Sequence, residues 1–220
     1  MKDKKKQYLC TPNYELCTMH YKLLSLLLLL SLPSLAQTPN KQQARTIVEK
    51  TTQLFQNPGG CKFHFHTKAL GLYSTEGDMI IKGNKSFAQN KGKTIWNDGR
   101  TAWIWEHWKN TVTIVNPKDH QDNRIGDQIK LIKESELQLQ QVGNNWQVTI
   151  KLPKKKGFFS KAVALINRQN YHPVQLKLRY MQIWITVDFS QFSIGNYPDD
   201  TFTFDPKRFP NTKIVDKRNK

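Results

Sequence analysis

The chain has 220 residues, of which 34 are Lys or Arg and 17 are Asp or Glu, and its net charge at pH 7 is +17. This length is enough for one domain with a substantial core. The charge indicates a basic surface that is either simply solvated or attracts an anionic partner such as a lipid headgroup or a membrane face. Nucleic acid is the least expected partner, because the N-terminal segment directs the chain out of the cytoplasm.

That segment, residues 19–36, has the layout of a cleavable secretory signal. Lys22 precedes an apolar run from Leu23 to Leu32, and the small residues Ser34 and Ala36 follow at the positions that a leader peptidase reads. The run is too short to cross about 30 Å of bilayer hydrocarbon as a helix. We therefore expect cleavage after Ala36.

The expected mature segment, residues 37–220, is long enough for a single domain. Met19 is the expected start of translation, so that residues 1–18 are an upstream extension. No cysteine directly follows Ala36 to accept a lipid, and we expect a soluble exported protein without an anchor. Cys61 is the only cysteine left after cleavage, which excludes an intramolecular disulfide and favours the role of a small buried hydrophobe.

Helical spacing is clear in one stretch, between Asn40 and the stop signal Asn57-Pro58-Gly59-Gly60. Apolar and small residues recur there at i, i+3, i+4 and i+7. They are Ala44, Ile47, Val48, Thr51, Leu54 and Phe55. The pattern predicts an amphipathic helix.

After Gly60 the hydrophobic period changes to two, which is typical of strands. The sequence Asn97-Asp98-Gly99 between two such runs predicts a tight hairpin, because Gly tolerates the positive φ of the turn. Strands are expected at 61–66, 78–82, 94–96, 101–105, 110–115, 146–152, 174–180 and 183–189. Strands joined by short turns are antiparallel neighbours, so we expect a large meandering sheet with one apolar face, covered by one or two helices.

Two segments lack this alternation. Residues 117–134 favour a short helix through Ile125, Ile129 and Ile132, bracketed by polar loop. The run Pro153-Lys154-Lys155-Lys156-Gly157 indicates a solvated loop, with a lipid-facing basic patch as the alternative.

Motifs for catalysis are absent from the sequence: there is no Gly-x-Ser-x-Gly, no phosphate-binding glycine loop and no Cys-x-x-Cys. His64 and His66 have a spacing compatible with metal ligation, but no third ligand stands at a recognisable distance. Asp199-Asp200 follows Tyr197-Pro198 and fits a turn better than a pair of catalytic carboxylates. We expect no enzyme, no metal and no cofactor; a metal-dependent enzyme built on the two histidines is the alternative of a different class.

Tryptophan is abundant, at positions 96, 103, 105, 108, 146 and 184. Large rings fill the core between sheet and helix in one interpretation. In the other, a curved sheet with many inward apolar positions and few covering helices encloses an apolar cavity.

The order of several motifs resembles a known family. The segments are Gly77 to Lys82, Phe87, Asn97 to Trp105, Leu152 to Lys156, His172 to Leu176, Phe202 to Pro206 and Ile214 to Asp216. Together with the helix, and across residues 40–216, they resemble the periplasmic outer-membrane lipoprotein carriers, whose founding member is LolA. The last four segments look like that family's closing strands.

The resemblance implies a mainly β fold with a few helices (α+β). It is an incomplete, strongly curved antiparallel β-barrel of about ten or eleven strands, closed by a helical lid. It also implies a carrier that shuttles lipoprotein acyl chains from the inner to the outer membrane. The implied partners are an inner-membrane lipoprotein-releasing transporter and an outer-membrane acceptor, and we expect a monomer. Export without an anchor favours the soluble shuttle over the anchored receiver.

Alternation then selects the expected cavity lining, which consists of Phe63, Phe65, Met79, Ile81, Trp103, Trp105, Val148, Ile150, Leu176, Leu178, Ile185 and Val187. The lid helix is expected to contribute Ile47, Val48, Leu54 and Phe55. The alternative function is a periplasmic protein of the same fold that binds another amphiphile, such as free lipid, a glycolipid or a hydrophobic export cargo.

One departure from the family concerns the lid. In these carriers an arginine that ties the barrel to its lid follows the strand that matches Met79 to Lys82, and this chain has Gly83-Asn84 there. Lys82 and Lys85 are the nearby cations that could take its place, although lysine lacks the forked donors of arginine.

Overall fold

The structure is a computed structural model of the chain, and it describes residues 41–117, 135–151 and 159–218. These residues belong to one compact unit. Within the described ranges, no helix has the length and apolar character needed to cross a membrane. The secretory signal, the short helix expected around Ile125–Ile132 and the basic loop 153–157 lie outside the described residues.

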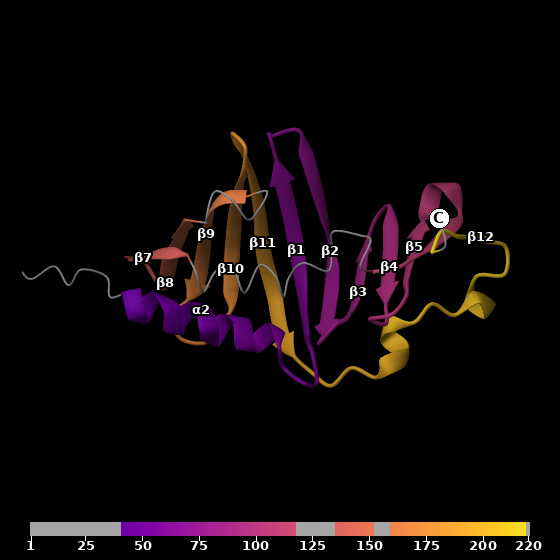
Figure 1. Ribbon diagram of the computed structural model, residues 1–220, viewed down its shortest axis with the longest axis horizontal. Helices are drawn as coiled ribbons and strands as arrows, with labels where there is room; N and C mark the ends of the chain where they lie inside the picture. The colour runs from indigo at the N-terminus through magenta and orange to yellow at the C-terminus, as the bar shows by residue number, and fades with distance from the viewer. Residues whose placement is uncertain (1–40, 118–134, 152–158, 219–220) are drawn as a thin grey trace, which may run out of the picture. The chain divides into compact units, whose positions relative to one another are not determined.

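The described strands form a single sheet built from two meanders (Figure 1). The first meander consists of β1 (Cys61–Ala69), β2 (Tyr73–Lys82), β3 (Lys85–Asn90), β4 (Lys93–Asn97), β5 (Ala102–Glu106) and β6 (Thr111–Val115). The second consists of β7 (Glu136–Val142), β8 (Asn145–Lys151), β9 (Phe159–Asn167), β10 (Pro173–Tyr180) and β11 (Ile183–Ile194). Antiparallel pairing of β1 with β11 joins the two meanders.

The remaining elements are short or lie on the sheet. Strand β12 (Lys213–Asp216) pairs in parallel with β6 and forms one end of the sheet, while β7 forms the other. Helix α2 (Lys41–Phe55) confirms the helix expected from the apolar spacing. Three 3-10 turns complete the described part of the chain: η1 (His107–Lys109), η3 (Asp199–Phe202) and η4 (Pro206–Arg208).

The expected hairpin between β4 and β5 is confirmed. Gly99 has a φ of +90°, and the Asp98 carboxylate accepts hydrogen bonds from the backbone N–H groups of Arg100 and Thr101 at 2.8 and 2.7 Å. An aspartate that bonds its own backbone in this way is a common turn former. The turn sequence therefore fixes the register in which Trp96 lies opposite Trp103.

The mainly β fold and the open, curved sheet agree with expectation, with two corrections. The described sheet has twelve strands rather than about ten or eleven, because β3, β7 and β9 were not predicted. Residues 202–206 were expected in a closing strand, but Phe202 ends η3 and residues 203–206 belong to no strand. Phe202 and Phe204 are both buried because this segment crosses a face of the sheet instead of extending it.

The register assigns each strand residue to one of two faces, since directly opposed residues on neighbouring strands point to the same side. We call the side that carries Phe63 and α2 the inner face and the other side the outer face. On the inner face, α2 lies across the strands of the second meander (Figure 1).

Two apolar clusters occupy the inner face. In the first, Ala44 and Ile47 of α2 pack on β7, β8 and β9; its sheet residues are Leu137, Leu139, Val148, Ile150, Ala162 and Ile166. The second contains Cys61, Phe63 and Ile81, with Phe55 from the end of α2 packed against them. One helix thus contributes to both clusters, through different turns.

A third cluster lies on the outer face of the first meander. It contains Trp96, Val112 and Phe204, with Phe209 packed against them. Phe204 and Phe209 belong to the C-terminal segment after β11. This segment therefore covers the outer face of the first meander, whereas α2 covers the inner face of the second. Such burial of aromatic side chains contributes strongly to stability.

Candidate functional site

The inner face carries an apolar strip between its two clusters. Ile185 and Val187 of β11 point to this face, opposite Leu178 and Leu176 of β10. Ile185 and Val187 are half-buried, and neither is among the described residues that pack against the two clusters. Side chains of this kind retain apolar surface that a further apolar group can cover. We define Phe65, Leu178, Ile185 and Val187 as the inner strip.

The expected lining residues on β1 and β2 meet at one end of this strip. Phe63 and Ile81 are buried, with exposed fractions of 4% and 7%. Phe65 and Met79 are half-buried and pack against them. Phe63 lies 5.7 Å from the ring of Phe55 in an edge-on arrangement. The C-terminal end of α2 thereby closes this end of the strip.

The second-meander residues lie beneath α2. Val148 and Ile150 are almost fully buried, at 0% and 2% exposed, in the cluster that contains Ile47. Leu176 and Leu178 are half-buried at its margin. Val148 and Ile150 can therefore meet a ligand only if the helix moves away, whereas Leu178 already borders the strip.

The expected lid residues divide between the two clusters. Ile47 is 3% exposed in the first cluster, Val48 packs against that cluster, and Phe55 packs against the second. Leu54 is half-buried. These contacts show a helix that lies closed on the inner face.

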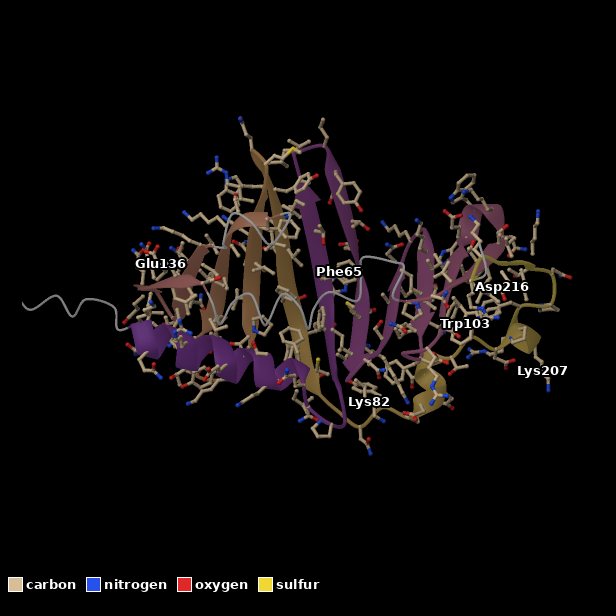
Figure 2. The ribbon with its side chains drawn as sticks, viewed as in Figure 1. Phe65, Lys82, Trp103, Glu136, Lys207 and Asp216 are labelled. Atoms are coloured by element: carbon tan, nitrogen blue, oxygen red, sulfur yellow. The ribbon has the colours of Figure 1, made fainter. Side chains whose placement is uncertain are left out.

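Trp103 and Trp105 do not lie with the other ten expected lining residues. Lys82 pairs with Lys85 across a tight turn, so that Ile80, not Met79, lies opposite Phe87. This register carries Phe87, Trp96 and Trp103 along the outer face. Figure 2 shows Phe65 on β1 near the middle of the sheet and Trp103 on β5 toward the end that carries β12.

On the outer face the two tryptophans face the C-terminal segment. The ring of Trp105 lies 4.8 Å from that of Phe209, and Trp103 packs against the third cluster. Ile95 and Ile104 face inward on the same strands, where they lie directly opposite each other and are half-buried. Alternation along β4 and β5 separates the tryptophans from the isoleucines but does not show which of them face inward. The register through β3 decides this.

Lys82 and Lys85 bind the C-terminal segment rather than α2. Their ammonium groups lie 3.2 and 2.6 Å from the Asp199 carboxylate, and Lys82 also donates to the Tyr197 carbonyl at 2.7 Å. Figure 2 shows Lys82 at the end of β2, beside this segment. Hydrogen bonds from the two lysines, Lys85 first, lower the pKa of Asp199 below its usual range. The two cations thus tie the β2–β3 hairpin to η3.

The histidines and the cysteine have local roles. His64 contacts Asp78 at 3.2 Å and His66 contacts Ser74 at 2.8 Å, each across to β2. No group of three potential ligands for a metal ion occurs among the described residues. Cys61 is fully buried, which confirms its expected place in the core, and burial raises the pKa of its thiol to about 11.

The comparison with protein families decides the assignment. The model of the family described as outer membrane lipoprotein carrier protein LolA matches residues 32–182, well over half of the chain. The chain belongs to this family. The LolA assignment confirms the resemblance inferred from the order of motifs, and a curved, open sheet with a helix on one face is the LolA-like arrangement.

Three solved structures resemble the chain in part of their fold. An uncharacterised conserved protein from Thermus thermophilus is 9% identical with a TM-score of 0.54, and the match covers 80% of this chain and 99% of that protein. A LolA superfamily protein from Nitrosomonas europaea is 13% identical with a TM-score of 0.39, covering 73% and 97%. The lipoprotein LppX of Mycobacterium tuberculosis is 11% identical with a TM-score of 0.47, covering 72% and 98%. None of the curated protein sequences compared with the chain matches it.

Proposed function

We propose that this protein binds the acyl chains of lipoproteins along its inner strip and carries them through the periplasm, without catalysis. The observation that carries the proposal is the strip itself: Ile185 and Val187 are apolar, point to the inner face and are left half-buried by α2. Acyl chains resist exposure to water by about 0.8 kcal/mol for each CH₂. A soluble apolar surface beneath a helix lowers the barrier to moving them between membranes.

Helix α2 is the proposed lid. Its contacts with the sheet are side-chain packing through residues such as Ile47 and Phe55, and packing contacts of this kind can be exchanged for contacts with a ligand. Displacement of α2 would extend the strip to Val148 and Ile150. An exported form beginning near Gln37, an inner-membrane donor and an outer-membrane acceptor complete the proposal.

A dye-binding experiment on residues 37–220 tests the strip. The wild type should bind a hydrophobic fluorescent dye such as N-phenylnaphthylamine, and an acylated peptide should displace the dye from the protein. Val187→Asn places an unpartnered amide in the strip and should weaken dye binding about tenfold. Val163→Asn is the matched control, because Val163 is also a half-buried valine but lies on the outer face, opposite Lys177.

The two valine variants must differ for the proposal to stand. Equal effects of the two substitutions, or a wild type that takes up neither dye nor acyl chains, would contradict it. Mass spectrometry of an organic extract of the purified protein separates the cargo classes. Acylated peptides support lipoprotein carriage, whereas free lipid or glycolipid supports the alternative amphiphile.

A further inference from the structure

Two hairpin turns lie side by side where neighbouring strands of the sheet end. In this section, the edge of the sheet means such a row of strand ends and not an outermost strand. Residues 70–72 connect β1 to β2, and residues 181–182 connect β10 to β11. Because β1 and β11 are antiparallel with Ala69 opposite Ile185, both turns reach the same edge. Figure 1 shows the two tips extending next to each other beyond the neighbouring strands.

Both tips expose large apolar side chains. At the first turn, Leu70 is 66% exposed, Leu72 92% and the first residue of β2, Tyr73, 57%. At the second, Met181 is 72% exposed and Trp184, near the start of β11, 39%. These residues, which we call the apolar tips, are five of the nine large hydrophobic side chains that are exposed in the described part of the chain. Large exposed apolar side chains gathered on one side of a protein mark interaction sites.

The backbone makes this choice of residues unusual. Leu70 has a φ of 56° and Met181 a φ of 51°. This left-handed region favours Gly and Asn, and it is unfavourable for long apolar side chains. Both turns therefore carry an apolar side chain where a polar or small one would suit the turn better, which points to a role outside folding.

A row of cations lies on the outer face at the same edge. Lys151, Lys161 and Arg179 are directly opposite one another on β8, β9 and β10, and Arg179 lies opposite Trp184 of the second tip. Like charges in this arrangement repel each other. Lys151 has Glu136 as a partner at 3.2 Å, whereas no ion pair of Lys161 or Arg179 is present among the described residues. Anionic groups from outside the protein would relieve this repulsion.

We propose that this edge docks on the surface of an anionic lipid bilayer. The apolar tips enter the boundary between headgroups and acyl chains, where Trp and Tyr are favoured, and the cation row contacts lipid phosphates. The charge of the chain, +17, has the sign that attracts such a surface. A bilayer fits better than a protein partner, because the tips project as two separate points instead of lining a groove. This docking is independent of whether the inner strip carries acyl chains.

Vesicle co-sedimentation of residues 37–220 tests the proposal. The protein should bind phosphatidylcholine vesicles that contain about one quarter phosphatidylglycerol and bind pure phosphatidylcholine vesicles much more weakly. The double variant Leu70→Asn, Met181→Asn should bind the anionic vesicles at least about tenfold more weakly. Asn suits a left-handed backbone, so its thermal unfolding midpoint should not fall, and the loss cannot be assigned to misfolding.

Two further variants separate the apolar and charged contributions. Lys161→Gln with Arg179→Gln should weaken binding to anionic vesicles about 25-fold, at about fivefold for each cation, and leave binding to neutral vesicles unchanged. Val142→Asn is the control, since Val142 is 40% exposed on the β7–β8 turn at the opposite edge. It should bind like the wild type.

Three results would overturn the proposal. The first is a wild type that does not bind anionic vesicles. The second is a Val142→Asn variant whose binding falls as much as that of the tip variant. The third is that the tip and cation variants bind as tightly as the wild type. Light scattering tests the alternative that a second copy of the chain binds the apolar tips. A concentration-dependent dimer that the tip variant abolishes would assign the apolar tips to self-association instead.

Discussion

The Cys61 thiol shows how burial alone can suppress the chemistry of a residue. It lies fully buried beside Phe63 and Ile81, and this burial raises its pKa to about 11. Only the thiolate reacts as a nucleophile, and at pH 8 it amounts to about one molecule in a thousand at such a pKa. We expect iodoacetamide to leave Cys61 unmodified in folded residues 37–220 and to modify it after unfolding in urea, as read by peptide mass spectrometry. Rapid labelling of the folded protein would show that the core around β1 opens.

The contribution of Asp199 to the stability of the fold depends on pH. Its hydrogen bonds with Lys85 and Lys82 lower its pKa in the folded state, so its contribution to stability is present above the unfolded pKa of about 4 and is lost as pH falls through the lower folded value. Asp199→Asn should therefore lower the unfolding midpoint slightly at pH 7 and have progressively less effect in acid. The group is exposed, which keeps the effect small.

Asp200→Asn is the control for this experiment. Asp200 is the exposed neighbour of Asp199 in η3, and the ion pairs of the two lysines go to Asp199. Equal unfolding midpoints of Asp199→Asn and wild type at pH 7, by thermal circular dichroism, would show that the tie between the β2–β3 hairpin and η3 does not stabilise the fold.

At the scale of elements, α2 depends on a few buried side chains. Ile47 is 3% exposed and packs on strands of the second meander. Ile47→Ala should lower the free energy of unfolding by about 2–4 kcal/mol, from lost burial and the cavity left behind. Urea unfolding measures this change. Glu49→Ala, on the exposed side of the same helix, should change it by no more than about 0.5 kcal/mol.

The elements themselves were predictable where one side chain period dominates. The helix and the Asn97-Asp98-Gly99 hairpin follow directly from local patterns. Strand β9 was missed because Ala162 to Ile166 is a continuous apolar run without alternation, as expected for a strand with neither face fully solvated. Strand β7 was missed because its two buried residues, Leu137 and Leu139, follow a segment without a clear pattern.

At the scale of the whole molecule, the distribution of residues between the faces could not be predicted from alternation. Alternation shows that Trp103 and Trp105 share a face, but the face depends on the turn at Gly83, which sets Lys82 opposite Lys85. The pairing of β1 with β11 is likewise a contact between residues far apart in the sequence. The expected lining therefore mixed two surfaces, one beneath α2 and one beneath the C-terminal segment.

The inner strip makes a quantitative prediction about ligand length. If an acyl chain lies along the apolar face, each added CH₂ that is buried contributes about 0.8 kcal/mol, which corresponds to about a fourfold gain in affinity. Lysophospholipids of increasing chain length, kept below their micellar concentrations, should displace the dye from residues 37–220 with this increment. The increment should cease once the chain exceeds the apolar surface. Val187→Asn should shift the whole series to weaker binding, and Val163→Asn should leave it in place. Affinities that do not depend on chain length would place the binding at the headgroup and contradict an acyl-binding face.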